Sequence, residues 1–402
     1  FSLTFGGCRM LIQRELLNIL RKHDYSDGKA VVIFGARRVG KTTILRNIVG
    51  DEDCTWIDGD AEGEAAMFRF STTADARTFL HRTPNIVIDE AQHIPDFGRM
   101  LKILVDTNEM SDTPARIFVT GSSALDLAGG VNESAVGRFE AFHLWPISLA
   151  ELGETKGTVN ALKNIPQHLV FGMLPNIITK PETAVKTLKG FTNSILFKDI
   201  FSLVGIRKPQ SFMLLVKCLA DRIGSEVSYD GLARETGLSK HTVSDYIDLL
   251  EQCFVIRQCT SFSRNVVNEI KKGKKIYFCD LGIRNAILDR FAPLDMRPDV
   301  GALWENYFYM ERVKWLEERR PGSNLWFWRT KQPQGQEIDF VEEYMGERTT
   351  FECKFKDGTK AKMPAAFAEA YGTCPFHVVT PGTVWPFVSG EGKGGMVWRK
   401  GN

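Results

Sequence analysis

Hydrophobic and polar positions form alternating blocks along the first 150 residues. Apolar residues at helical spacing fill residues 10–25. Short apolar, β-branched runs follow at Ala30–Phe34, Asn85–Ile88 and Arg116–Val119, with helix-type sequence between them. Strands that alternate with helices predict a parallel sheet covered on both faces, and such sheets bind ligands at the carboxyl ends of their strands. We therefore predict an α/β domain over residues 10–150.

The pattern changes after residue 150. Helical sequence dominates residues 151–225, and a helix-turn-helix pattern followed by β-type sequence fills residues 226–289. Residues 290–402 begin with a long helical stretch, and three β-type runs come after it at Leu325–Arg329, Glu337–Glu342 and Thr349–Phe355. We expect a helical region, a winged helix-turn-helix and a C-terminal α/β domain, in that order.

The loop after the first predicted strand carries the clearest chemical signal. It reads GARRVGKT and fits the phosphate-binding pattern G-x-x-x-x-G-K-[ST]. Its glycines let backbone N–H groups turn toward phosphate oxygens, and the helix that begins at Lys41 adds the positive end of its dipole. We expect Lys41 to reach the β- and γ-phosphates and the Thr42 hydroxyl to bind Mg²⁺. The predicted nucleotide-binding residues are Gly35, Ala36, Arg37, Arg38, Val39, Gly40, Lys41, Thr42 and Thr43.

Candidate catalytic residues lie further along the domain. Asp89 and Glu90 end an apolar run, so Asp89 is predicted to hold the Mg²⁺ shell and Glu90 to polarise the attacking water; alternatively, both are caps after a buried strand. Ser122 ends the next strand and is predicted to sense the γ-phosphate, although ordinary loop chemistry also explains it. Arg138 follows a glycine-rich stretch and is either an arginine finger, in cis or from a neighbouring subunit, or a solvated surface residue.

These segments resemble a known family. GARRVGKT, IVIDEAQ, FVTGSSALDL and GRFEAFHLWPISLAEL are similar to AAA+-like bacterial and archaeal ATPases that carry a C-terminal domain of unknown function. The resemblance runs from the helix with Arg14 to the ECK stretch at 352–354. Its loop often has Pro and Gln where this chain has Ala36 and Arg38. The resemblance implies ATP as the nucleotide, and it places Arg138 on the family's Gly-Arg position.

Residues 227–254 predict a winged helix. Ser239 is expected to cap a second helix, which would bring Lys240 and His241 to the tip that enters a DNA groove. Basic residues also gather in 264–275. The same helix carries carboxylates that disfavour phosphates, at Asp245, Asp248 and Glu251. DNA contact and a structural or protein-docking winged helix therefore both stay open.

The C-terminal pattern is similar to that of restriction-endonuclease-type nucleases. These need an Asp, then Glu-x-Lys on the next strand, often with a helical Glu ahead. Glu305 lies in the predicted long helix, Asp339 on one β-type run, and Glu352 and Lys354 on the next. The acids would bind metal, and the lysine would position or deprotonate water. Such domains also exist as inactive DNA-binding or structural shells, and the sequence does not decide between these states.

Composition limits the partners. The 51 Lys and Arg against 49 Asp and Glu give a net charge of +2, which excludes binding of nucleic acid through bulk positive charge. Eight cysteines without a C-x-x-C pair predict reduced thiols in a cytoplasmic protein. No apolar run approaches the ~18 residues of a membrane span. The helix pattern that opens at Met10 suggests that residues 1–9 are a leader or an added segment.

Together these features predict an ATP-hydrolysing, AAA+-like switch whose nucleotide state controls a winged helix and a nuclease-like domain on nucleic acid. A nucleotide-gated binding or scaffold protein with an inert C-terminal domain is the alternative, and a metal-dependent nuclease regulated by ATP is the third. Homo-oligomers are expected because Arg138 would have to act in trans.

Overall fold

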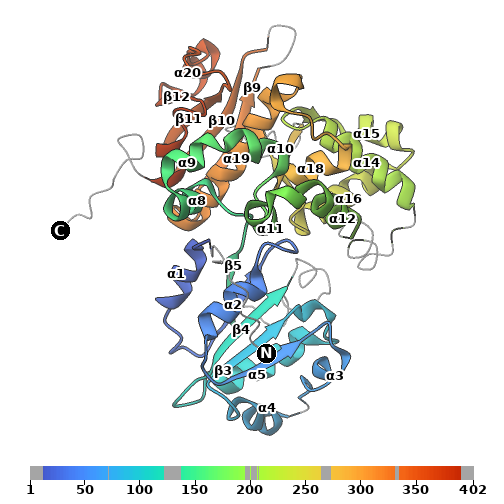
Figure 1. The fold of residues 1–402 in the computed structure, drawn as a ribbon, viewed down its shortest axis with the longest axis vertical. Coiled ribbons are helices and arrows are strands. Elements are labelled where there is room, and N and C mark those ends of the chain that lie inside the picture. Colours follow the sequence, from blue (N-terminus) through green and yellow to red (C-terminus); the bar gives the residue numbers. More distant parts are fainter. Residues whose placement is uncertain are drawn as a thin grey trace, which may run out of the picture.

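The computed structural model forms two lobes (Figure 1), of which one holds the described residues up to about 143 and the other holds the described residues after them. The residues it describes are 12–70, 72–121, 137–194, 200, 206, 208–263, 273–330 and 335–390. The predicted positions Ser122, residues 1–9 and most of the basic stretch 264–275 lie outside these ranges.

Five parallel strands form the sheet of the first lobe: β1 (Ala30–Phe34), β2 (Cys54–Asp58), β3 (Asn85–Asp89), β4 (Arg116–Gly121) and β5 (Phe139–His143). Their order is β2-β3-β4-β1-β5. β1, β3 and β4 are buried almost throughout, and their continuous apolar sequence predicted them. β2 and β5 are half-exposed edge strands with mixed sequences, CTWID and FEAFH, which the sequence pattern did not reveal.

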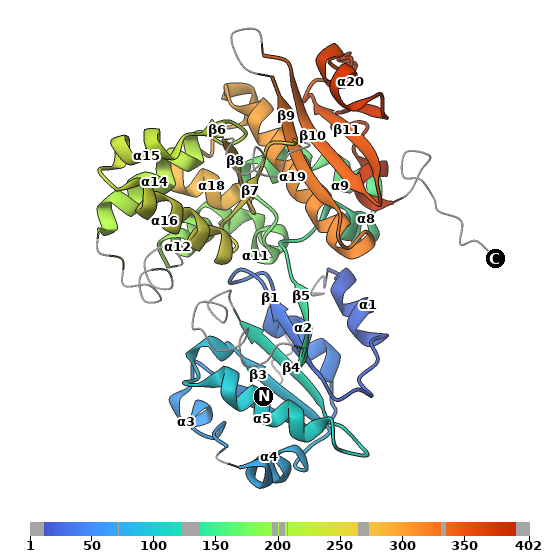
Figure 2. The same ribbon diagram turned by 180° about the vertical axis from the view of Figure 1, so that it is seen from behind.

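Helices cover both faces of this sheet, as predicted. α2 (Lys41–Val49) leads from β1 toward β2, whereas α5 (Phe97–Asn108) leads from β3 in the opposite direction to β4. Right-handed crossovers therefore place α2 and α5 on opposite faces (Figures 1 and 2). α3 (Glu62–Ala65) and α4 (Thr73–Leu80) complete the lobe, and α1 (Glu15–Arg21) forms a shorter helix than the predicted 10–25.

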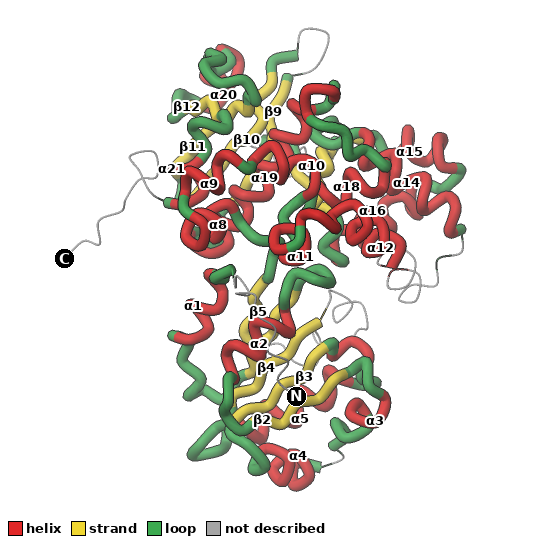
Figure 3. The backbone as a smooth tube through the Cα atoms, viewed as in Figure 1, coloured by secondary structure: helices red, strands yellow, loops and turns green. Residues whose placement is uncertain are grey.

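A run of helices opens the second lobe, as the pattern of residues 151–225 predicts: α8 (Leu149–Lys156), α9 (Thr158–Lys163), α10 (Ile165–Phe171), α11 (Pro175–Thr179) and α12 (Ala184–Ser194). Ser148 and Glu151 form a capping box that starts α8. These helices pack on later parts of the chain: α8 contacts α21 (Trp385–Ser389), and α10 and α12 contact α18 (Leu281–Leu288). Figure 3 shows this run of helices crossing the front of the second lobe.

The helix-turn-helix stretch folds as predicted. α15 (Tyr229–Thr236) ends at Gly237 with φ of 68°, and α16 (Lys240–Gln252) begins where the Ser239 hydroxyl accepts a hydrogen bond from the Thr242 N–H. The buried side of α16 includes Val243 and Ile247. α14 (Pro209–Asp221) packs on α15, and an antiparallel sheet of β6 (Glu226–Val227), β8 (Lys274–Phe278) and β7 (Ile256–Cys259) follows.

The C-terminal part contains the predicted long helix and three β-type runs. α19 (Val300–Arg319) precedes a sheet in the order β12-β11-β10-β9, made by β9 (Asn324–Arg329), β10 (Glu337–Tyr344), β11 (Glu347–Cys353) and, after α20 (Ala365–Tyr371), β12 (Phe376–Val379). β9, β10 and β11 pair antiparallel, whereas β12 runs parallel to β11. No helix in the described part of the chain is long and apolar enough to cross a membrane.

Candidate functional site

The predicted phosphate-binding loop joins β1 to α2 at the carboxyl edge of the first sheet. Gly40 has φ of 104° and Arg38 has φ of 66°, so the loop turns sharply before the helix begins at Lys41. An added Cβ at Gly35 would lie 2.3 Å from the Leu144 carbonyl oxygen, which requires glycine there. The strand, glycine turn and helix N-terminus therefore stand in the order that phosphate binding needs.

Lys41 is buried inside this loop. Its Nζ donates to the Gly35 carbonyl at 2.8 Å and to the Ala36 carbonyl at 3.3 Å, and it lies 3.7 Å from Glu90 Oε1. Burial lowers the pKa of Lys41, and the carboxylates of Glu90 and Asp89 oppose that shift. The ammonium group is thus held by loop carbonyls and by the predicted catalytic carboxylate.

Asp89 and Glu90 meet a hydroxyl from the neighbouring strand. The Thr120 side chain of β4 donates to Asp89 Oδ1, and its oxygen accepts the Glu90 N–H at 3.1 Å. Glu90 has φ of 50°, and its Oε2 accepts a hydrogen bond from Gln92 at 2.6 Å. Burial raises the pKa of Glu90, but Lys41 and Gln92 outweigh it and keep the pKa below its usual value. Glu90 is therefore a charged carboxylate.

The donor set beside the loop suits a hard cation such as Mg²⁺. Asp89 offers a buried carboxylate and Thr42 a half-buried hydroxyl at the first turn of α2, and both are oxygen ligands. The Thr120 hydroxyl binds the Asp89 carboxylate through Oδ1. These residues fit the metal that the sequence predicts.

Sequence reasoning missed three groups at this edge. Asp60 contacts His93 Nδ1 through its carboxylate and lies 4.0 Å from Arg37 of the loop. Gly59, just before Asp60, donates its N–H to the Asp89 carbonyl at 2.8 Å. The triplet Asp58-Gly59-Asp60 after an apolar stretch is the signal that identifies this corner, but it is readable only once β2 is recognised.

A pocket of about 160 Å³ opens next to the loop, between α1, α2 and α11. Its walls are largely apolar, and Gly40 and Thr43 of the loop form one side. The other residues that line it include Ile12, Leu17, Ile44, Ile147, Pro175 and Asn176. Residues of both lobes therefore line this pocket beside the phosphate loop.

Two arginines predicted at the site contact other parts of the protein. Arg38 places its guanidinium 5.1 Å from the Phe191 ring of α12, so it contacts the second lobe. Arg138 lies at the amino end of β5, where its carbonyl accepts the Ala30 N–H and its side chain pairs with Asp106. The five-residue strand β1 separates that end from the loop by roughly 16 Å. The expectation that Arg138 acts in cis is therefore wrong for this conformation, and a role in a neighbouring subunit stays a prediction.

The predicted DNA-contact residues are both exposed and both paired with acids. Lys240 Nζ donates to Asp230 at 2.8 Å, and His241 Nδ1 lies 2.7 Å from Asp245. Both carboxylates belong to the same helix-turn-helix, so the tip of α16 has little excess positive charge.

The structure brings the four predicted nuclease residues to one place. Cys353 donates its N–H to Asp339 at 2.6 Å, and Lys354 donates to Glu352 at 2.7 Å. Burial, followed by the carboxylates of Glu305 and Glu352, raises the pKa of Asp339 to about 8. Asp339, Glu352 and the helical Glu305 therefore influence one another electrostatically.

Lys275, which the sequence placed in the basic stretch 264–275, lies in this acidic centre instead. Lys275 of β8 is buried, and its Nζ lies 3.0 Å from Glu305 and 2.5 Å from Glu337. Burial alone lowers the pKa of Lys275, but these two carboxylates raise it above its ordinary value. In the part of the chain that is described, no three His, Cys, Asp or Glu side chains are arranged to hold a metal ion.

Family models match three consecutive parts of the chain. Residues 27–153 match the AAA domain, and residues 162–294 and 300–385 match two domains of unknown function, DUF8612 and DUF4143. Uncharacterized proteins of Mycobacterium tuberculosis and Mycobacterium bovis are each 31% identical over 355 residues, which is 87% of this chain and 75% of the relative. The chain belongs to this AAA-domain family.

A further relative and a solved structure add to the comparison. An uncharacterized protein of Haemophilus influenzae is 23% identical over 340 residues, 77% of this chain and 78% of that protein. A Walker-type ATPase of Pyrococcus abyssi aligns with a TM-score of 0.47 and 15% identity, over 69% of this chain and 96% of that one. Membership of the AAA-domain family assigns the loop GARRVGKT to a P-loop ATPase domain that binds nucleotide.

The cysteines agree with the sequence expectation. All those in the described ranges are free thiols: Cys54, Cys218, Cys253, Cys259, Cys279, Cys353 and Cys374.

Proposed function

We propose that this protein hydrolyses ATP at the P-loop and that the nucleotide state sets the arrangement of its second lobe. The observation that carries the proposal is the convergence of Lys41, Asp89, Glu90 and Thr120 at the carboxyl edge of one parallel sheet. Those four side chains come from three separate elements, and they form one network of hydrogen bonds and charges.

The network supports a specific division of roles. On ATP binding, Lys41 would exchange the Gly35 and Ala36 carbonyls for phosphate oxygens. The exchange is favourable because an ammonium group binds a charged acceptor more strongly than a neutral one. Thr42 and Asp89 would hold Mg²⁺, which supplies charge neutralisation at the phosphates. Glu90, ionised and released from Lys41, would orient and polarise the attacking water.

The pocket beside Gly40 and Thr43 is the proposed place for the adenine. It lies against the loop on the side of α1 and α11, and its apolar walls suit a planar base. Because Pro175 and Asn176 belong to the second lobe, a base in this pocket would touch both lobes. Nucleotide binding would then stabilise one arrangement of the two.

Steady-state turnover tests the enzymatic claim. The purified chain with Mg²⁺ is expected to release phosphate from ATP, and Lys41→Ala is expected to abolish the release, with and without DNA or RNA in the assay. Lys29→Ala, which removes an exposed ion pair with Asp27 just before the amino end of β1, is the matched control and is expected to keep wild-type turnover. Turnover by wild type equal to that of Lys41→Ala would refute hydrolysis at this site.

A second function, that of a nucleotide-gated binding or scaffold protein, is favoured by the pairing at α16. A DNA phosphate would have to displace Asp230 from Lys240 and Asp245 from His241. Titration of a DNA duplex at several salt concentrations separates the two functions. Affinity that depends on bound nucleotide supports a coupled machine on DNA, whereas the absence of binding at low salt supports the scaffold.

For the C-terminal unit we propose a nuclease-like fold whose acidic centre is occupied by the Lys275 side chain. The order helix, three antiparallel strands, helix and a parallel strand supports the resemblance, together with the adjacency of Asp339 and Glu352. Lys275 already supplies a cation to this centre, which favours an inert domain in the present conformation. Plasmid cleavage by wild type that is lost in both Asp339→Ala and Lys354→Ala would show an active nuclease instead.

A further inference from the structure

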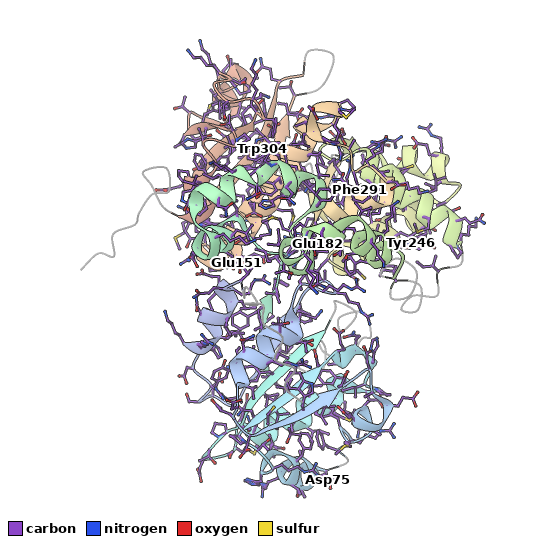
Figure 4. The ribbon with its side chains drawn as sticks, viewed as in Figure 1. Asp75, Glu151, Glu182, Tyr246, Phe291 and Trp304 are labelled. Atoms are coloured by element: carbon purple, nitrogen blue, oxygen red, sulfur yellow. The ribbon has the colours of Figure 1, made fainter. Side chains whose placement is uncertain are left out.

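Arg14 joins three parts of the molecule that are distant in sequence. It is buried just before α1, and its guanidinium donates to the Val39 carbonyl at 2.8 Å, to the Trp145 carbonyl at 2.6 Å and to Glu151 Oε1 at 2.9 Å. Val39 belongs to the P-loop, Trp145 follows β5, and Glu151 lies in α8 of the second lobe (Figure 4).

The geometry makes these contacts interdependent. A guanidinium is planar and rigid, so its three bonds fix the relative positions of their acceptors. Val39 immediately precedes Gly40 and Lys41, and the loop also abuts the chain after β5, since an added Cβ at Gly35 would lie 2.3 Å from the Leu144 oxygen. A shift of the P-loop backbone therefore either moves Trp145 and Glu151 with it or breaks a buried bond of Arg14.

Residues 144–149, which we name the linker, carry the connection onward to α19. Three alternate linker residues each bond to a different turn of that helix: the Trp145 Nε1–H donates to Glu317 at 2.6 Å, the Ile147 carbonyl accepts from Lys314 at 3.0 Å, and the Leu149 N–H donates to Glu311 at 2.6 Å. The linker thus lies antiparallel along α19, bound through spacings of three residues on one face of the helix.

The amino-terminal part of α19 reaches the acidic centre. Glu305 lies twelve residues before Glu317, a distance of about 18 Å along the axis of a single helix. It accepts hydrogen bonds from Tyr277 at 2.6 Å and from Lys275 at 3.0 Å, both on β8. A displacement of the linker is therefore transmitted by a stiff element to the contact between β8 and the C-terminal unit.

We infer that Arg14 is a positioning residue that couples the nucleotide state of the P-loop to the linker and to α19. The inference rests on the proposed function, because it presupposes that ATP binds at the loop. Arg14 acts through the Val39 carbonyl, and it also lines the pocket beside the loop. Through this coupling, rearrangement of the loop on ATP binding changes how firmly the linker is held against α19.

Hydrogen exchange of the full chain, with and without a non-hydrolysable ATP analogue and Mg²⁺, tests this coupling. In wild type the analogue is expected to change exchange of the linker and of α19 by about fivefold or more, the lower end of usual coupling strengths. Arg14→Ala is expected to lose that change at an analogue concentration that saturates the site; saturation is needed because Arg14 also lines the proposed base pocket. Arg14→Lys is expected to keep part of it, because one ammonium cannot hold three acceptors in a plane.

Two further variants keep the result interpretable. Arg290→Ala removes an exposed ion pair with Asp221, outside the contacts of Arg14, the linker and α19, and is expected to retain the wild-type response. Glu151→Gln weakens the Arg14 bond without removing the side chain, and it carries the test if Arg14→Ala does not fold. An unchanged nucleotide response in Arg14→Ala or in Glu151→Gln overturns the coupling. Failure of wild type to bind the analogue overturns the proposed function instead.

Discussion

The stability of the second lobe should fall in mild acid because of one buried histidine. His168 in α10 is 5% exposed, and its Nδ1 has no hydrogen-bond partner within the described residues. Burial, followed by the charges of Lys156 and Lys314, lowers the pKa of His168 from 6.5 to about 3. The folded chain therefore keeps this imidazole neutral, whereas the unfolded chain binds a proton below pH 6.5.

The sign and size of the effect follow from this difference. Stability from the neutral imidazole is fully present above pH 6.5 and is lost as the pH falls from 6.5 toward 3, because only the unfolded state gains the proton. At pH 5 the unfolded state is favoured by about 2 kcal/mol relative to pH 7.5. For a unit of this size that is roughly 4–8 °C in the melting temperature.

Thermal unfolding of wild type and His168→Leu at pH 7.5 and pH 5 measures the loss of stability that His168 causes in acid. The leucine variant is expected to lose about 2 kcal/mol less than wild type between the two pH values, whatever its stability at pH 7.5. His241→Leu is the matched control, since the His241 side chain is 87% exposed, and it should track wild type. Equal pH slopes for wild type and His168→Leu would show that His168 is not held neutral.

Two further predictions concern packing and catalysis. An added Cβ at Gly153 in α8 would lie 2.1 Å from the Trp385 ring, so Gly153→Ala should destabilise by about 1 kcal/mol even after the helix gains propensity. Gly190→Ala in α12 meets nothing within 4 Å and should stabilise by about 0.5–1 kcal/mol; equal melting shifts for the two variants would contradict the contact. Thr120→Val removes the hydroxyl bound to Asp89 and should lower ATP turnover about 10–100-fold with little change in nucleotide affinity, whereas unchanged turnover would remove Thr120 from the site.

The central strands and the P-loop could be predicted because their signals are local. Buried parallel strands read as continuous apolar runs, and the loop is recognised from eight consecutive residues. The edge strands β2 and β5 gave no such signal, since each is exposed on one side and mixes polar with apolar residues. Asp60 and its partner His93 were missed for the same reason, because their place beside the loop depends on β2.

Contacts between distant parts of the chain were beyond sequence reasoning. Arg14 and Glu151 are 137 positions apart, and Lys275 meets Glu305 across a domain junction. No periodicity or spacing encodes such pairs, which depend on how whole elements dock. Arg138 shows the opposite error: its position after a glycine-rich segment suggested a catalytic role, but the register of β5 beside β1 places it at the far edge of the sheet.

The nucleotide retained by Glu90→Gln tests the central claim most directly. Wild type and Glu90→Gln would be mixed with a limiting amount of ATP and Mg²⁺, and the bound nucleotide would be identified after denaturation. Because the amide keeps the size of the carboxylate but cannot polarise water as a base, the variant is expected to hold ATP while wild type holds ADP. Bound ADP in Glu90→Gln, formed as fast as in wild type, would contradict hydrolysis through Glu90.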